Sequence, residues 1–234
     1  MKAHIHVPVS DLAMSLAFFL SLEYRVLQES DEHAFITDGC IVLHLNARNV
    51  PAGYVFYVSD LKEQLSKLKD SGVSCRLSLD EDSAYREILI EAPDKAVLRF
   101  LQIADEPHLD EVAPTSICGT HYGIGIMAED FVGSIEFWEK LGFKLTSGTK
   151  ESKSYVEMSN GTIPLGIYRV GSCPHTFVNP SLTYFEKDMA DRIAKAKSAG
   201  ITFVEEITQF NENGIVDHAI WKSPSGLHAF MFCC

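Results

Sequence analysis

The sequence predicts an α+β fold in which four βαβββ motifs build mixed, curved sheets that form cups, with the helices outside. Three observations lead to this prediction. The chain has 234 residues, of which 46% are hydrophobic, and this is enough to bury a core. Its second half repeats the plan of the first. Each half also contains two amphipathic helical patterns, each preceded by one strand-like run and followed by about three.

The internal repeat is clearest at a shift of 119 positions. Residues 15–19 (SLAFF) reappear as residues 134–138 (SIEFW), and Asp11 reappears as Asp130. An acidic, proline-containing stretch separates the halves and has the composition of a connector. We therefore expect a first module over residues 1–103, a linker over 104–118 and a second module over 119–234, with two motifs in each module.

Four helices follow from apolar residues at positions i, i+4 and i+7, a spacing that lines one helix face. Asp60 with Glu63 resembles a capping box, and Gly72, Gly142 and Gly200 stand where a helix needs a left-handed end. We interpret the apolar stripes as core packing against a sheet. The stripe residues are Leu12, Leu16 and Phe19; Leu61, Leu65 and Leu68; Phe131, Ile135 and Trp138; and Met189, Ile193 and Ala196.

Strand-like runs fill the segments between these helices. A strand that returns beside its neighbours after a helical crossover leaves one sheet face to the helices and the other face concave. Two motifs side by side therefore predict a cup. In the first half the expected strands are residues 3–9, 24–28, 33–37, 40–46, 54–58, 73–79, 85–91 and 96–102, and in the second half Asn160 and Gly161 read as a hairpin turn.

Composition excludes several classes of function. Twenty Lys and Arg against thirty-two Asp and Glu give a formal net charge of −12, the wrong sign for binding nucleic acid. The start of the chain lacks the apolar run of a signal peptide, and no stretch is apolar enough to span a membrane, so we expect a cytoplasmic protein. Six cysteines without a CxxC spacing indicate reduced, mostly buried thiols and no zinc or disulfide framework.

Several segments resemble the vicinal oxygen chelate superfamily, which includes glyoxalase I, bleomycin-resistance and fosfomycin-resistance proteins and extradiol dioxygenases. They are residues 9–12 (VSDL) leading into 15–19, residues 134–143 (SIEFWEKLGF), and the turns at 224–226 (PSG) and 93–95 (PDK). The resemblance implies two tandem glyoxalase/bleomycin-resistance-like modules. It implies less about activity, because this scaffold carries several chemistries and also pure binding.

Members of this superfamily usually hold a divalent metal in the cup, with ligands from the first and last strands of a motif. The resemblance places His4 at such a first-strand position. Strand alternation leaves His44 pointing into the cup, because Ile41, Leu43 and Leu45 form the apolar face of the last strand. If a metal is present, His4 and His44 are the ligands that the resemblance implies.

The other corresponding positions disfavour a metal. In the first module they hold Tyr54 and Arg99, and a guanidinium repels a cation. In the second module they fall at Gly166 or Tyr168 and at Phe230, so His121 is the one ligand candidate left if its strand is regular. Because transition metals in proteins normally take three or more side-chain ligands, we expect no cofactor, and a divalent metal is the alternative.

The residues at these positions favour an organic ligand instead. Arg99 can offer a planar fork to a carboxylate, or it can pair with Glu87 or Glu91, and Phe230 can equally fill the core. We expect a protein, monomeric or homodimeric, that binds a small organic molecule in a metal-free cup. The alternatives are a metal-dependent lyase, isomerase or dioxygenase of glyoxalase type and a scaffold that binds nothing. The candidate ligand-binding residues are His4, His44, Tyr54, Arg99, Tyr168 and Phe230.

Overall fold

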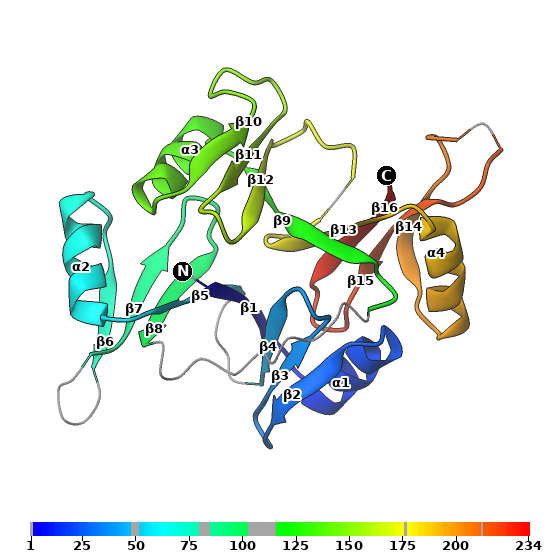
Figure 1. The fold of residues 1–234 in the computed structure, drawn as a ribbon, viewed down its shortest axis with the longest axis horizontal. Helices are drawn as coiled ribbons and strands as arrows, with labels where there is room; N and C mark the ends of the chain where they lie inside the picture. Colours follow the sequence, from blue (N-terminus) through cyan, green and yellow to red (C-terminus); the bar gives the residue numbers. More distant parts are fainter. Residues whose placement is uncertain (1, 48–51, 80–84, 103–115, 176, 212) are drawn as a thin grey trace. The chain divides into compact units, whose positions relative to one another are not determined.

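The computed structural model describes residues 2–47, 52–79, 85–102, 116–175, 177–211 and 213–234 (Figure 1). Four βαβββ motifs follow one another along the chain, which confirms the predicted fold class. The first two motifs are β1 (Lys2–Pro8), α1 (Leu12–Ser21), β2 (Arg25–Glu29), β3 (His33–Thr37) and β4 (Val42–Asn46), then β5 (Gly53–Val58), α2 (Leu61–Asp70), β6 (Arg76–Leu79), β7 (Tyr85–Glu91) and β8 (Val97–Gln102). The last two are β9 (Thr120–Ala128), α3 (Phe131–Lys140), β10 (Lys144–Ser147), β11 (Tyr155–Ser159) and β12 (Pro164–Arg169), then β13 (Ser181–Glu186), α4 (Met189–Ser198), β14 (Phe203–Ile207), β15 (His218–Lys222) and β16 (His228–Cys233).

The strands form two mixed, curved and open sheets (Figure 1). Their strand orders are β2-β3-β4-β1-β5-β8-β7-β6 and β10-β11-β12-β9-β13-β16-β15-β14. The first strand of a motif runs parallel to its last strand, as in the pairs β5 with β8, β9 with β12 and β13 with β16. The remaining pairs within a motif are antiparallel. Each sheet therefore joins two consecutive motifs, as two tandem modules require.

The chain divides into two compact units that are not continuous in sequence. Unit 1 comprises Met1–His6, Pro51–Glu106 and Ile124–Asn179, and thus holds the second and third motifs. Unit 2 comprises Val7–Val50, Pro107–Gly123 and Pro180–Cys234, and holds the first and fourth. The division at residues 104–118 that the sequence suggests stays a prediction, because residues 103–115 lie outside the described part of the chain.

In unit 1, helices α2 and α3 bury the stripes that the sequence predicts. They cover a sheet face rich in aliphatic and aromatic side chains, among which Ile88, Leu98 and Phe100 are essentially inaccessible to solvent. Trp138 of α3 packs its ring 5.4 Å from that of Tyr54 on β5. Burial of this apolar area is the main stabilising contribution to the unit.

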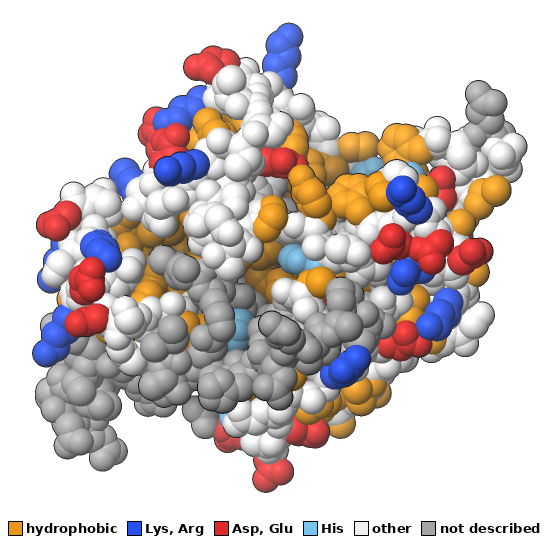
Figure 2. Space-filling model, viewed as in Figure 1, with side chains coloured by type: hydrophobic (Ala, Val, Ile, Leu, Met, Phe, Trp, Pro, Cys, Tyr) orange, Lys and Arg blue, Asp and Glu red, His pale blue; other side chains and the backbone are white. Residues whose placement is uncertain are grey.

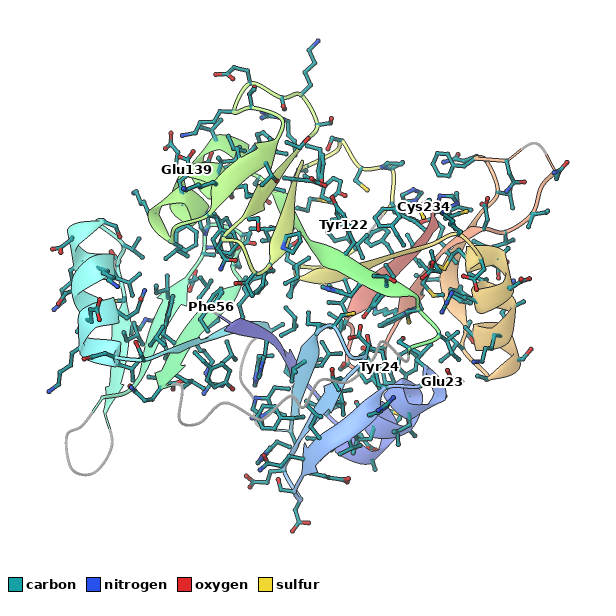
Figure 3. All side chains as sticks on the ribbon, viewed as in Figure 1. Glu23, Tyr24, Phe56, Tyr122, Glu139 and Cys234 are labelled. Atoms are coloured by element: carbon teal, nitrogen blue, oxygen red, sulfur yellow. The ribbon has the colours of Figure 1, made fainter. Side chains whose placement is uncertain are left out.

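Unit 2 has an aromatic core around α1. The ring of Phe19 lies 5.2 Å from Tyr24 and 6.1 Å from Trp221 of β15. The hydroxyl of Tyr24, a residue labelled in Figure 3, hydrogen-bonds to the hydroxyl of Tyr184 on β13. The two buried phenols satisfy one another, as buried polar groups require.

Local signals in the sequence have the predicted structural effect. Asp60 Oδ1 accepts hydrogen bonds from the backbone N–H groups of residues 62 and 63 and so caps α2. Gly72, Gly142 and Gly200 all adopt positive φ at the ends of their helices. The cysteines are free, but the expectation that most are buried is wrong, since Cys118 alone is buried. No helix in the described ranges combines the length and apolarity needed to cross a bilayer.

Candidate functional site

The strand register of unit 1 shows which side chains share the sheet face that is not covered by helices, here called the helix-free face. His4 on β1 stands opposite Val55 on β5, and Val55 stands opposite Arg99 on β8. Directly opposed residues project to the same side of a sheet. His4 and Arg99 therefore occupy one face, as the sequence predicts.

Tyr54 lies on the other face. It stands opposite Leu98 and Ile5, and both of these side chains are buried in the core. The Tyr54 ring contacts Trp138 there, and burial raises the pKa of its phenol well above the usual value. The sequence-based prediction for Tyr54 is therefore off by one residue in register. Val55, and not Tyr54, lies beside Arg99 on the helix-free face.

Two further residues on the helix-free face were missed by the sequence analysis. His6 follows His4 at the next inward position of β1, and Tyr57 follows Val55 on β5. The Tyr57 ring lies 4.8 Å from that of His4. Burial, with a smaller effect of the Arg99 charge, lowers the pKa of His6 to about 4, so this imidazole is neutral at neutral pH. The period of two along residues 4–6 was the signal that could have identified His6.

Arg99 forms the ion pair with Glu87 that was one of its two expected partners. Its Nε donates to Glu87 Oε2 at 2.7 Å, and the two side chains are 19% and 15% exposed. Glu91, the other expected partner, binds Lys95 instead. Within the described residues, no hydrogen-bond partner occupies the two terminal nitrogens of Arg99. A fixed guanidinium with two unused donor groups remains on this face.

Tyr168 occupies the helix-free face of the third motif, also in unit 1. It stands opposite Met127 on β9 and Tyr155 on β11, and the two tyrosine rings are 4.7 Å apart. The Tyr155 hydroxyl donates to Glu157 at 2.6 Å. A Cβ on Gly166 would lie 2.9 Å from the Tyr155 ring, so the ring occupies the space that a side chain at this position would fill.

His44 belongs to unit 2 and takes the orientation that alternation predicts. Leu43 and Leu45 are buried against α1, whereas His44 faces the other way. Its ring stacks on Phe35 of β3, with centroids 4.2 Å apart and planes at 15°. Because His4 and His44 fall in different units, the pair stays a prediction as a set of metal ligands.

The remaining candidates also lie in unit 2. Phe230 is almost fully buried and stands opposite Thr183 and Ile220 on the helix-free face. His121 does not point to this face, because its ring contacts the core residue Tyr184 at 5.4 Å, and burial lowers its pKa. The prediction of His121 as a ligand assumed that its strand is regular, and β9 does not keep a regular alternation of faces at this residue.

Four βαβββ motifs in two curved, open sheets define the fold of the vicinal oxygen chelate superfamily, so the resemblance seen in the sequence is confirmed for the fold. Solved structures similar to this chain include extradiol dioxygenases. A catechol 2,3-dioxygenase matches with a TM-score of 0.61 and 16% identity over 99% of this chain and 86% of its own. Homoprotocatechuate 2,3-dioxygenase from Arthrobacter globiformis matches with a TM-score of 0.67 and 11% identity over 99% of this chain and 78% of its own. The enzyme from Brevibacterium fuscum, in complex with 3,4-dihydroxyphenylacetate, matches with a TM-score of 0.66 and 13% identity over 97% of this chain and 78% of its own. Neither a protein-family model nor a curated protein matches the sequence.

This comparison corrects the expectation that no cofactor is needed, because the extradiol dioxygenases that share the fold are metal-dependent enzymes that use iron. The residues of this chain do not fit such a centre in an obvious way. Arg99 and Phe230 stand where the resemblance puts ligands, and the described residues contain no group of three or more His, Cys, Asp or Glu that could hold a metal ion.

Proposed function

We propose that this protein binds a small aromatic acid on the helix-free face of unit 1, with Arg99 as the anchor of the carboxylate. The observation that carries the proposal is the hydrogen bonding of the Arg99 guanidinium. Its Nε is held by Glu87 at 2.7 Å, while its terminal nitrogens have no partner among the described residues. A planar guanidinium held in one orientation can donate two parallel hydrogen bonds to a carboxylate.

The neighbours of Arg99 on this face suit the rest of such a ligand. His6 stays neutral at neutral pH, so it adds no second charge and can either donate or accept a hydrogen bond. The rings of Tyr57 and His4 are almost fully buried, lie 4.8 Å apart and form an aromatic wall on the same face. Few polar groups among apolar and aromatic neighbours are typical of a small-molecule site.

The similar structures support this class of ligand. The homoprotocatechuate 2,3-dioxygenase of Brevibacterium fuscum has been solved with 3,4-dihydroxyphenylacetate, which combines a phenolic ring with a carboxylate. Tyr54 lies on the opposite, core face of the sheet and is not part of this site, whereas His44, Tyr168 and Phe230 stay predictions as ligand contacts. The alternative, a scaffold that has no ligand, predicts that the protein does not bind 3,4-dihydroxyphenylacetate.

Calorimetric titration with 3,4-dihydroxyphenylacetate, catechol and phenylacetate tests the proposal. Catechol lacks the carboxylate, so it should bind the native protein more weakly than the two acids. Replacing Arg99 alone would leave Glu87 as an uncompensated buried charge, so the test variant is the double substitution Arg99→Met, Glu87→Gln. It should weaken binding of both acids about tenfold or more and leave catechol binding unchanged.

The matched control is Arg25→Met on β2 of unit 2, where the arginine is exposed. It should bind all three compounds as the native protein does. Equal affinity of the native protein and the double variant for 3,4-dihydroxyphenylacetate, with both folded by circular dichroism, would overturn the assignment of Arg99.

A second candidate function is ring-cleaving dioxygenation, which the likeness to extradiol dioxygenases over nearly the whole chain favours. The candidate metal ligands that the resemblance implies are His4 in unit 1 and His44 in unit 2, and each is tested by its own substitution. Protein purified without chelator should then contain about one iron per chain, and His4→Ala, His44→Ala should lose it. Oxygen consumption with catechols should follow the iron content. Iron-reconstituted protein that consumes no oxygen with these substrates would exclude this candidate.

A further inference from the structure

Unit 2 carries a continuous series of aromatic rings that the proposed function does not use. We name it the aromatic ladder and define it as Tyr122, Phe185, Phe232, His218 and Phe210. Successive ring centroids are 5.2, 6.0, 5.1 and 4.9 Å apart. These spacings are those of interacting aromatic side chains.

The strand register places the three middle residues of the ladder on the helix-free face of the fourth motif. Phe232 on β16 stands opposite both Phe185 on β13 and His218 on β15. The residues next to them, Tyr184 and Met231, are fully buried on the other face. The ladder is therefore separate from the core that α4 covers.

Both ends of the ladder are accessible to solvent. Tyr122 is 44% exposed and Phe210 is 60% exposed, which is unusual for large apolar side chains in a contiguous series. In Figure 2 hydrophobic side chains lie next to a histidine at the surface, and Figure 3 labels Tyr122 on β9. The loop that bears Phe210 is held closed by Asn211, whose Oδ1 accepts from the backbone N–H of Ile215 at 2.9 Å.

The charge around the ladder is negative. Asp217 accepts a hydrogen bond from His218 Nδ1 at 2.8 Å, which holds the pKa of the Asp217 carboxyl below its usual range. Glu205 lies on the same face of β14, opposite Ile220. The ladder itself contains no Lys or Arg, and the basic residue on this face of β15 is Lys222, four residues away from His218. The chain as a whole carries a formal charge of −12.

We propose that the aromatic ladder is a binding site for a planar aromatic cation. Stacking between aromatic rings and the attraction of a cation to the electron-rich ring faces both favour such a ligand, and the carboxylate of Asp217 complements its charge. The site is independent of the proposed function, because Arg99 in unit 1 selects the opposite charge. No segment outside unit 2 is required.

Two bicyclic probes of similar size and opposite charge test this proposal on the full chain: 1-methylquinolinium and 2-naphthoate. By fluorescence titration, 1-methylquinolinium should bind the native protein at least about threefold more tightly than 2-naphthoate does. Phe210→Ala should weaken 1-methylquinolinium binding about threefold to tenfold, and Asp217→Asn should reduce the preference for the cation. The control Leu20→Ala, which truncates a side chain 49% exposed on α1, should change neither.

The outcomes separate this proposal from the function proposed for unit 1. The double variant Arg99→Met, Glu87→Gln should keep full affinity for 1-methylquinolinium while losing the aromatic acids. Equal affinity for both probes, or binding of the cation that is unaffected by Phe210→Ala and by a second variant, Phe232→Leu, would overturn the assignment of the ladder without bearing on Arg99.

Discussion

Asp94, in the turn between β7 and β8, holds a carboxylate that the fold of unit 1 keeps largely out of water. Its Oδ1 accepts a hydrogen bond from the backbone N–H of Ala96 at 3.3 Å, while its buried Oδ2 has no partner among the described residues. Burial raises the pKa of Asp94 from 3.8 to about 6, and the hydrogen bond from Ala96 opposes part of this shift. Between these two pH values the folded chain binds a proton that the unfolded chain does not.

The consequence is a loss of stability as pH rises through this window. A shift of about 2 pKa units corresponds to roughly 3 kcal/mol of unfolding free energy that is present below pH 3.8 and gone above pH 6. Asp94→Asn removes the charge and retains an acceptor for the Ala96 N–H. We expect the variant to be more stable than the native protein by up to about 3 kcal/mol at pH 8 and by much less at pH 4.

Urea unfolding of both proteins at pH 4, 6 and 8 measures this difference directly, because other titrating groups cancel between them. Asp31→Asn, which neutralises an exposed carboxyl, is the control and should show a difference near zero at all three pH values. A gap between native protein and Asp94→Asn that does not change from pH 4 to pH 8, or a variant that is less stable at pH 8, would refute the reasoning.

Three further predictions concern stability and are read from urea or thermal unfolding. Gly53→Ala should lower the free energy of unfolding by about 3 kcal/mol or prevent folding, because the new Cβ would lie 1.8 Å from the carbonyl oxygen of Val97. A decrease below about 1 kcal/mol would contradict this close approach. Asp60→Ala should cost about 1 kcal/mol by removing the α2 cap, whereas Asp188→Ala, where the side chain makes no cap hydrogen bond, should cost less. His6→Gln should make stability less sensitive to acid. The pKa of His6 is about 4 in the folded chain and 6.5 in the unfolded chain, so the native protein loses roughly 3 kcal/mol of stability as pH falls through that range. An unchanged pH profile of stability in the variant would contradict this role of His6.

The elements of this fold were largely predictable from the sequence because the patterns that define them are local. The helical stripes had one apolar face each, and all four helices begin and end near the expected residues. The face of His44 was assigned correctly because a polar residue interrupts an apolar strand at a period of two.

The register of the second motif was harder to predict, for a physical reason. The β5 sequence is apolar at nearly every position, and five of its six residues are buried, so alternation carries no signal for which face Tyr54 takes. His121 was misplaced for a related reason, since its assignment assumed a regular strand. Unit 2 combines the first and the fourth motif, which are distant in sequence, and no local pattern encodes such a pairing.

The cofactor expectation failed because it rested on residue identities alone. Arg99 and Phe230 at presumed ligand positions argued against a metal, whereas the fold is shared with iron-dependent dioxygenases. The ion pair of Arg99 was predictable, because Glu87 was one of the two partners that the sequence offered for it.

A crystal structure of the protein soaked with 3,4-dihydroxyphenylacetate tests the central claim most directly. We expect the ligand on the helix-free face of unit 1, with its carboxylate within about 3 Å of the terminal nitrogens of Arg99 and the Glu87 pair still intact. A ligand bound elsewhere, with the Arg99 terminal nitrogens occupied by protein groups, would contradict it.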